Sequence, residues 1–84
     1  MTYRRRVDAT HGEVVQALRQ CGWTVEDTHA FPGFVDCLAH RGGKLWLVEI
    51  KGARGKLKPS QQRLIDAGFP VVVLRNAAEA SALR

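Results

Sequence analysis

Two acids and a lysine lie near the two ends of a predicted hairpin, FVDCLAHRGGKLWLVEIK. Gly42 and Gly43 separate its two alternating segments, which predicts a two-residue turn because both glycines can take a positive φ. Closing the chain at this turn places Asp36 directly opposite Glu49, and Lys51 projects from the same sheet face. Opposed like charges are destabilising on a sheet. The arrangement therefore predicts a divalent-cation site.

The strand that carries Glu49 is strongly apolar. Leu45–Ile50 is almost continuously hydrophobic, which is typical of a central strand covered on both faces. Carboxylates near the end of such a strand are costly unless a cation meets them. The alternative is that Asp36 and Glu49 splay into water on a surface hairpin.

A basic, glycine-containing loop follows the hairpin. Between Lys51 and Arg63 the chain has five basic residues and no acid. We identify three of the basic side chains as candidate phosphate contacts: Arg54, Lys56 and Lys58. A flexible solvated loop is the alternative. The amino-terminal cluster of Arg4, Arg5 and Arg6 has the same two interpretations, phosphate contact or frayed terminus.

The remaining elements follow from periodicity and from helix-stop signals. We predict a helix over 8–20, strands over 23–28 and 69–74, a helix over 59–67 and a last helix over 76–83. Pro59 suits the first turn of its helix, Gly22 and Gly68 suit helix ends, and Asn76 suits a cap. A helix between the third and fourth strands implies a parallel crossover. The sheet is therefore expected to be mixed.

Glu13 has two interpretations. Thr10-His11-Gly12-Glu13 fits a capping box, in which Glu13 bonds back to the amide at the helix start. Alternatively, Glu13 supplies a further carboxylate to the cation site. Spacing alone leaves both open.

Length and composition limit the function classes. The 84 residues are expected to form one domain (1–84), and the 45% apolar content argues against disorder. The net charge of +5 favours a polyanionic partner. Cys21 and Cys37 fit no zinc pattern and are expected to be reduced. The chain opens without a secretory signal and has no membrane-length apolar run, so we expect a cytoplasmic protein that does not bind membranes.

With this order of elements, the motifs VD(36), VE(49)IK(51) and KPSQ(61) resemble the PD-(D/E)XK nuclease superfamily. More narrowly, they resemble the small stand-alone VRR-NUC nucleases often found in phages. The resemblance extends from the first helix to the PVVVL strand. Val35 precedes Asp36 where the superfamily name has proline, a departure common among its members.

The resemblance implies an α/β restriction-endonuclease-like core, a mixed sheet with flanking helices in the order αβββαβα. It implies Mg²⁺ or Mn²⁺ held by Asp36, Glu49, the Ile50 carbonyl and Glu13. Lys51 would position or activate the attacking water, and Gln61 matches a glutamine that opens the next helix. A phage or bacterial origin is expected on the same ground.

The expected function follows from the same resemblance. The resemblance implies a metal-dependent DNA endonuclease that recognises branched DNA such as four-way (Holliday) junctions, acting as a homodimer. The basic loop indicates contact with the phosphate backbone rather than with base sequence. The alternative is a non-catalytic nucleic-acid-binding module that retains the nuclease fold.

Overall fold

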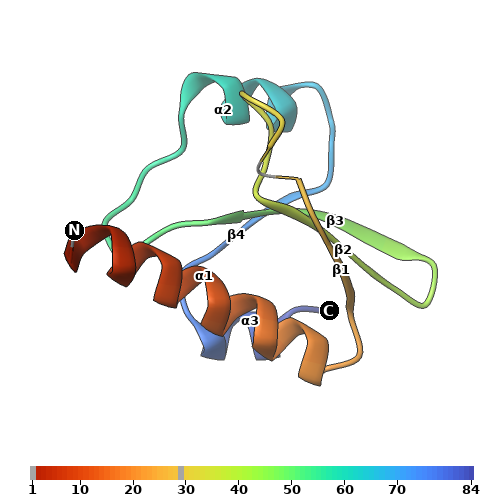
Figure 1. Cartoon of the computed structure of the whole chain (residues 1–84). Helices are drawn as coiled ribbons and strands as arrows, with labels where there is room; N and C mark the ends of the chain where they lie inside the picture. The colour runs from red at the N-terminus through yellow and green to blue at the C-terminus, as the bar shows by residue number, and fades with distance from the viewer. Residues whose placement is uncertain (1, 29) are drawn as a thin grey trace.

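The computed structural model describes residues 2–28 and 30–84, with side chains described from residue 9 onward. The elements are α1 (Thr2–Gln20), β1 (Thr24–Asp27), β2 (Cys37–Arg41), β3 (Lys44–Ile50), α2 (Pro59–Asp66), β4 (Val71–Leu74) and α3 (Ala77–Ala82). Figure 1 shows the sheet with α1 and α3 on one side and α2 on the other. The predicted order αβββαβα and the predicted mixed sheet with flanking helices are confirmed.

The sheet has the strand order β1-β2-β3-β4, so β3 is an interior strand as predicted. β1, β2 and β3 pair antiparallel, whereas β4 runs parallel to β3 after the α2 crossover. Arg41 pairs with Lys44 across the turn, and Gly42 and Gly43 have φ values of 57° and 81°. A side chain is disfavoured at such φ values, so the two glycines fix the hairpin register.

Successive side chains on a strand point to opposite faces of the sheet, so two apolar cores form, one on each face. Toward α1 and α3, fully buried Val14, Leu18 and Val48 belong to the larger core. Toward α2, a smaller core contains Leu47 and Leu64. Positions two apart on a strand share a face. Glu49 therefore projects on the α2 side with Leu47.

Several details confirm the sequence-based boundaries. Pro59 lies in the first turn of α2, and Gly68, with a φ of 95°, follows the helix end. The Asn76 side chain accepts a hydrogen bond from the Glu79 amide at 2.8 Å and caps α3. Cys37 lies in the larger core, and both cysteines are free thiols. No helix within the described ranges is long and apolar enough to span a membrane.

Two sequence-based predictions are wrong. α1 begins at Thr2 rather than at residue 8, so Thr10 lies inside the helix and the capping-box interpretation of Glu13 fails. Residues 2–9 contain neither glycine nor proline and include helix-favouring arginines, so nothing in them stops the helix. On α2, Leu64 is buried, whereas the neighbouring Ile65 is 37% exposed. The short α2 buries only the side that faces the smaller core.

Leu18→Ala is expected to destabilise the fold by about 3 kcal/mol, because it empties a fully buried position between α1 and the sheet. Leu45→Ala removes the same atoms from a side chain that is 43% exposed, and is expected to cost less than about 1 kcal/mol. Urea unfolding followed by circular dichroism measures both. Equal losses for the two variants would contradict this placement of the core.

Candidate active site

The predicted acid pair converges on the α2 side of the sheet. Asp36 directly precedes β2, and its amide donates to the Val48 carbonyl at 3.0 Å. The hairpin register pairs Val48 with Cys37, so Asp36 lies just outside the paired part of the hairpin, and the predicted direct pairing with Glu49 is not part of the register. Asp36 Oδ2 accepts a hydrogen bond from the Ile50 amide at 2.8 Å. The Lys51 Nζ lies 3.1 Å from Glu49 Oε2. Asp36, Glu49 and Lys51 therefore form one cluster at the ends of β2 and β3.

Glu49 is buried with an unsatisfied acceptor. The residue is only 3% exposed, and its Oε1 has no hydrogen-bond partner among the residues that the structure describes. Burial raises the pKa of the Glu49 carboxyl, the nearby Asp36 carboxylate raises it further, and Lys51 acts in the opposite direction. A buried carboxylate oxygen normally has a partner. This orphaned atom therefore fits a site completed by a bound cation.

The donor set suits a hard divalent cation. Mg²⁺ characteristically takes one or two carboxylates and retains several waters. Asp36 and Glu49 supply the carboxylates, and Ile50 lines the same cavity. Among the side chains described, no group of three or more histidine, cysteine, aspartate and glutamate residues comes together. The arrangement thus matches an open oxygen site rather than a closed cage of side chains.

A cavity of about 350 Å³ opens over the cluster. The lining residues are Phe31, Pro32, Gly33, Phe34, Val35, Asp36, Glu49, Ile50, Lys51, Lys58, Ser60 and Gln61. Charged and amide side chains come from Asp36, from the end of β3 and from the start of α2, whereas residues 31–35 of the loop before β2 supply the apolar wall. The cavity thus combines ionic groups with one aromatic side.

Gln61 lies at the cavity wall, as the sequence predicted, and is 6% exposed. Its Oε1 accepts a hydrogen bond from the Lys58 amide at 3.0 Å. This bond satisfies an amide at the start of α2 and fixes the side chain in place. Gln61 therefore has a capping role that sequence reasoning missed.

Arg75, which sequence reasoning also missed, holds the loop after β3. Its Nη1 donates to the carbonyls of Gly52 and Gly55 at 2.7 and 2.8 Å. A Cβ on Gly55 would lie 3.1 Å from the Lys51 Cβ, so this glycine packs tightly against the lysine stem. A basic residue directly after a strand parallel to β3 was the available signal, because such a residue ends up beside the same loop.

The other predicted basic residues lie around this loop. Arg54, Lys56 and Lys58 are all exposed, and of these only Lys58 lines the cavity. The side chains of Arg4, Arg5 and Arg6 lie outside the described part of the chain. The structure therefore leaves three exposed cations on the loop after β3 and on the first residues leading into α2.

Glu13 is not brought to the cluster. It is exposed on α1, which packs on the sheet face opposite the acid pair, and it does not line the cavity. The structure gives it contact neither with Asp36 nor with Glu49. Its predicted role as a metal ligand has no geometric support among the described residues.

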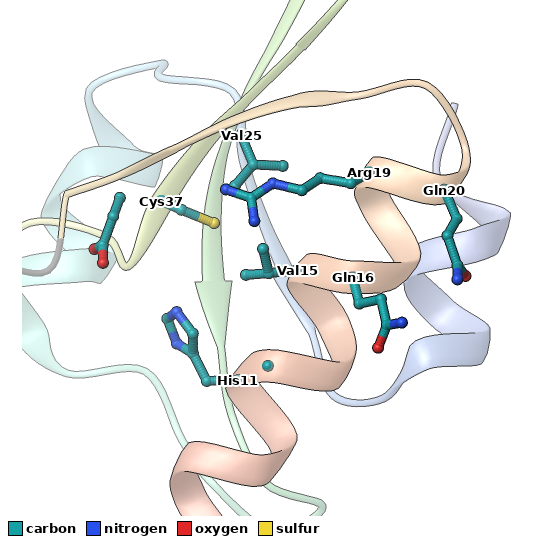
Figure 2. A pocket seen from close by; sticks show the side chains of 9 residues that line it. His11, Val15, Gln16, Arg19, Gln20, Val25 and Cys37 are labelled. Atoms are coloured by element: carbon teal, nitrogen blue, oxygen red, sulfur yellow. The ribbon is translucent and has the colours of Figure 1, made fainter.

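A second cavity of about 580 Å³ lies between α1 and the β1–β2 side of the sheet. Figure 2 shows His11 and Arg19 of α1 pointing toward the Cys37 thiol from strand β2. Burial raises the pKa of this thiol to about 12, and Asp36 contributes in the same direction. The thiol is therefore protonated and a poor nucleophile at neutral pH. The smaller cavity remains the candidate active site.

Comparison with known proteins supports the fold assignment. No family model matches the chain, and no curated protein matches it. A solved structure described as "VRR_NUC domain" superposes with a TM-score of 0.70 and 21% sequence identity. The match covers 92% of this chain and 91% of that one. The chain therefore has the fold of a VRR_NUC domain, and the resemblance drawn from its motifs is confirmed at the level of the fold.

Glu49→Gln is expected to raise the stability of the metal-free protein at neutral pH. Because the folded-state pKa of Glu49 is raised, folding favours its protonated form. The stability that this provides is complete below the unfolded pKa of about 4.3 and is lost as pH rises through the folded value. The neutral amide avoids that loss.

Thermal unfolding in chelator from pH 4 to pH 8 measures the effect. The Tm difference between Glu49→Gln and the parent protein should grow as pH rises. Glu26→Gln, which neutralises an exposed acid on β1, is the matched control and should show no comparable trend. A Glu49→Gln protein that is equally destabilised at both ends of the range would contradict the described burial.

Proposed function

We propose that this chain, with the fold of a VRR_NUC domain over residues 1–84, is a metal-dependent nuclease that hydrolyses phosphodiester bonds in DNA. The observation that carries the proposal is the buried Glu49 carboxylate, with one orphaned oxygen, beside Asp36 and Lys51 in a polar cavity. Perturbed carboxyl groups in a cleft are typical of functional sites. The fold match adds support but does not by itself establish an activity.

Asp36 and Glu49, with the Ile50 carbonyl, are the residues assigned to hold Mg²⁺ or Mn²⁺. When bound, such a cation lowers the pKa of water and neutralises phosphate charge. The Ile50 amide holds Asp36 Oδ2 in place at 2.8 Å, and Lys51 holds Glu49 Oε2 at 3.1 Å. Each carboxylate thus uses one oxygen to fix its orientation. Among the described residues Glu49 Oε1 has no hydrogen-bond partner, so this atom is assigned to the ligand.

Lys51 is assigned to stabilise negative charge on the scissile phosphate. Its ammonium lies at the cavity wall, and its stem is confined by Gly55 in the loop that Arg75 holds. A fixed cation that meets charge developing in the transition state needs no reorganisation during the reaction. We assign charge stabilisation rather than proton abstraction, since the lysine is ion-paired with Glu49.

Gln61 is assigned a supporting role at the cavity wall. Its Oε1 is engaged by the Lys58 amide, so the side chain has a fixed orientation beside the site. Glu13 is left out of the proposed ligand set because it lies exposed on α1, away from the cavity.

The substrate is proposed to be branched DNA, including four-way junctions, cut by a homodimer. The exposed side chains of Arg54, Lys56 and Lys58 suit phosphate oxygens, which carry no sequence information. Two copies would place two active sites against two strands, as cleavage at a junction requires. Labelled branched and linear DNAs incubated with either cation test this preference.

Asp36→Asn, Glu49→Gln and Lys51→Ala are each expected to lower the cleavage rate at least about 100-fold, because each removes a group that acts on the reacting phosphate. DNA binding should be partly retained, since the exposed basic residues remain. Glu13→Gln, which changes an acid of the same type away from the cavity, should retain most of the activity. Gel-based cleavage assays with Mg²⁺ and Mn²⁺ measure these rates. Cleavage by the triple variant would refute the assignment.

A non-catalytic nucleic-acid-binding module is the second candidate, favoured by the lack of a third acidic or imidazole ligand among the described side chains. Thermal unfolding with and without divalent cations distinguishes the nuclease from the binding module. Mg²⁺ or Mn²⁺ is expected to raise the Tm of the nuclease. A cation concentration of 100 times the dissociation constant adds about 2.7 kcal/mol to the free energy of unfolding. Asp36→Asn should lose this gain. Equal gains in the parent and variant, at matched ionic strength, would favour the binding module.

A further inference from the structure

Phe31 is an exposed aromatic side chain on the wall of the candidate active site. It is 62% exposed, more than the exposed Leu45, Ile65 and Phe69, at 43%, 37% and 49%. Unlike them, it lines the cavity that contains Asp36 and Glu49. Single exposed apolar residues are common on protein surfaces. Its place beside an ionic cavity makes this one a candidate for a ligand contact.

The backbone of Phe31 is held on both sides. Its amide donates to the Thr28 carbonyl at 3.0 Å, and its carbonyl accepts from the Phe34 amide at 3.3 Å. Thr28 is itself buried, and its hydroxyl donates to the Val35 carbonyl at 2.8 Å. Pro32 further restricts the residue before it. The ring is therefore presented to solvent from a turn that is tied to the strand carrying the site.

The same turn packs on α2. A Cβ on Gly33 would lie 3.7 Å from the Ser60 Cβ, which is ordinary van der Waals contact. Figure 1 shows the loop between β1 and β2 rising beside α2 on that side of the sheet. Phe31 is thus fixed relative to the start of α2 as well as to β2. Its distance from the acid pair is set by both elements.

The cavity offers two kinds of surface to one ligand. Lys51 and Lys58 supply cationic groups, and Phe31 with Pro32 supplies an apolar, partly aromatic side. A nucleotide has the matching composition, an anionic phosphate joined to a flat base. Bases stack on exposed aromatic rings with little sequence preference. A paired base inside a duplex has both faces covered by its neighbours, so it has no free face for the ring.

We propose that Phe31 is a stacking platform for an unpaired nucleobase next to the phosphodiester bound at Asp36 and Glu49. This inference rests on the proposed nuclease function and defines its substrate further. The DNA strand at the site must have at least one base out of the stack, as at a flap, a gap or an opened junction. Fully paired duplex presents phosphates to the lysines but no base to Phe31.

A double-mutant cycle tests the contact without cleavage. The two ligands are a fluorescent ten-nucleotide oligothymidylate and the abasic strand of equal length, which has the same phosphates and no bases. Binding is measured by anisotropy in chelator. Phe31→Ala is expected to weaken oligothymidylate binding about 5- to 150-fold and to leave binding of the abasic strand nearly unchanged. Phe31→Trp should restore or exceed the parent affinity, whereas Phe31→Leu should not.

Phe69→Ala is the matched control, since Phe69 is exposed but does not line the cavity. It should bind both strands as the parent protein does. Equal weakening of both ligands by Phe31→Ala, or no weakening of either, would overturn the proposal. A change in the oligomeric state of Phe31→Ala, measured by sedimentation, would also overturn the proposal, because Phe31 would then lie in a contact between protein chains. The larger effect of Phe31→Ala on oligothymidylate than on the abasic strand would persist even if the chain cleaves no DNA. The two proposals can therefore fail independently.

Discussion

The site depends on two like-charged carboxylates held together at the end of a strand whose Leu47, Val48 and Glu49 are buried. Glu49 is buried on interior strand β3, and Asp36, one residue before β2 begins, lies close enough to raise the pKa of the Glu49 carboxyl. Such a pair is unfavourable unless a cation or a hydrogen bond compensates it. The chain supplies part of this compensation through the Ile50 amide and the Lys51 ammonium. Within the described part of the chain, Glu49 Oε1 has no hydrogen-bond partner. A bound divalent cation would supply the partner that this oxygen lacks.

The rest of the fold confines these unfavourable charged groups to one face of the sheet. α1 and α3 pack against one face of the sheet, where the larger apolar core forms. The α2 face has only a small core, and the polar cavity opens next to it. Arg75 ties the loop after β3 to the end of β4, which confines the Lys51 stem. Stability thus comes mainly from one face, while the other face accommodates charged groups that an ordinary core would exclude.

The sequence predicted the acid cluster because it depends on local rules. A diglycine turn fixes the hairpin register, and the register determines which side chains face each other. Phe31 and Arg75 depend on tertiary contacts between segments distant in sequence, for which no spacing rule exists. The Gln61 cap is a local contact with the Lys58 amide, three residues earlier, and the capping-box spacing after Lys58 was the available signal. Glu13 shows the opposite error. A capping motif and a family pattern both matched it, but α1 begins at Thr2, which removes the cap, and Glu13 lies on the exposed side of the helix, away from the cavity.

The most direct test of the account is to locate the cation. Crystals of the protein soaked in Mn²⁺ would give an anomalous difference peak at the manganese position. The account predicts one strong peak in the cavity, at coordination distance from an oxygen of Asp36 and from Glu49 Oε1, with Ile50 as the nearest backbone group. A peak elsewhere on the chain, or the acid pair unchanged around an empty cavity at saturating Mn²⁺, would contradict it.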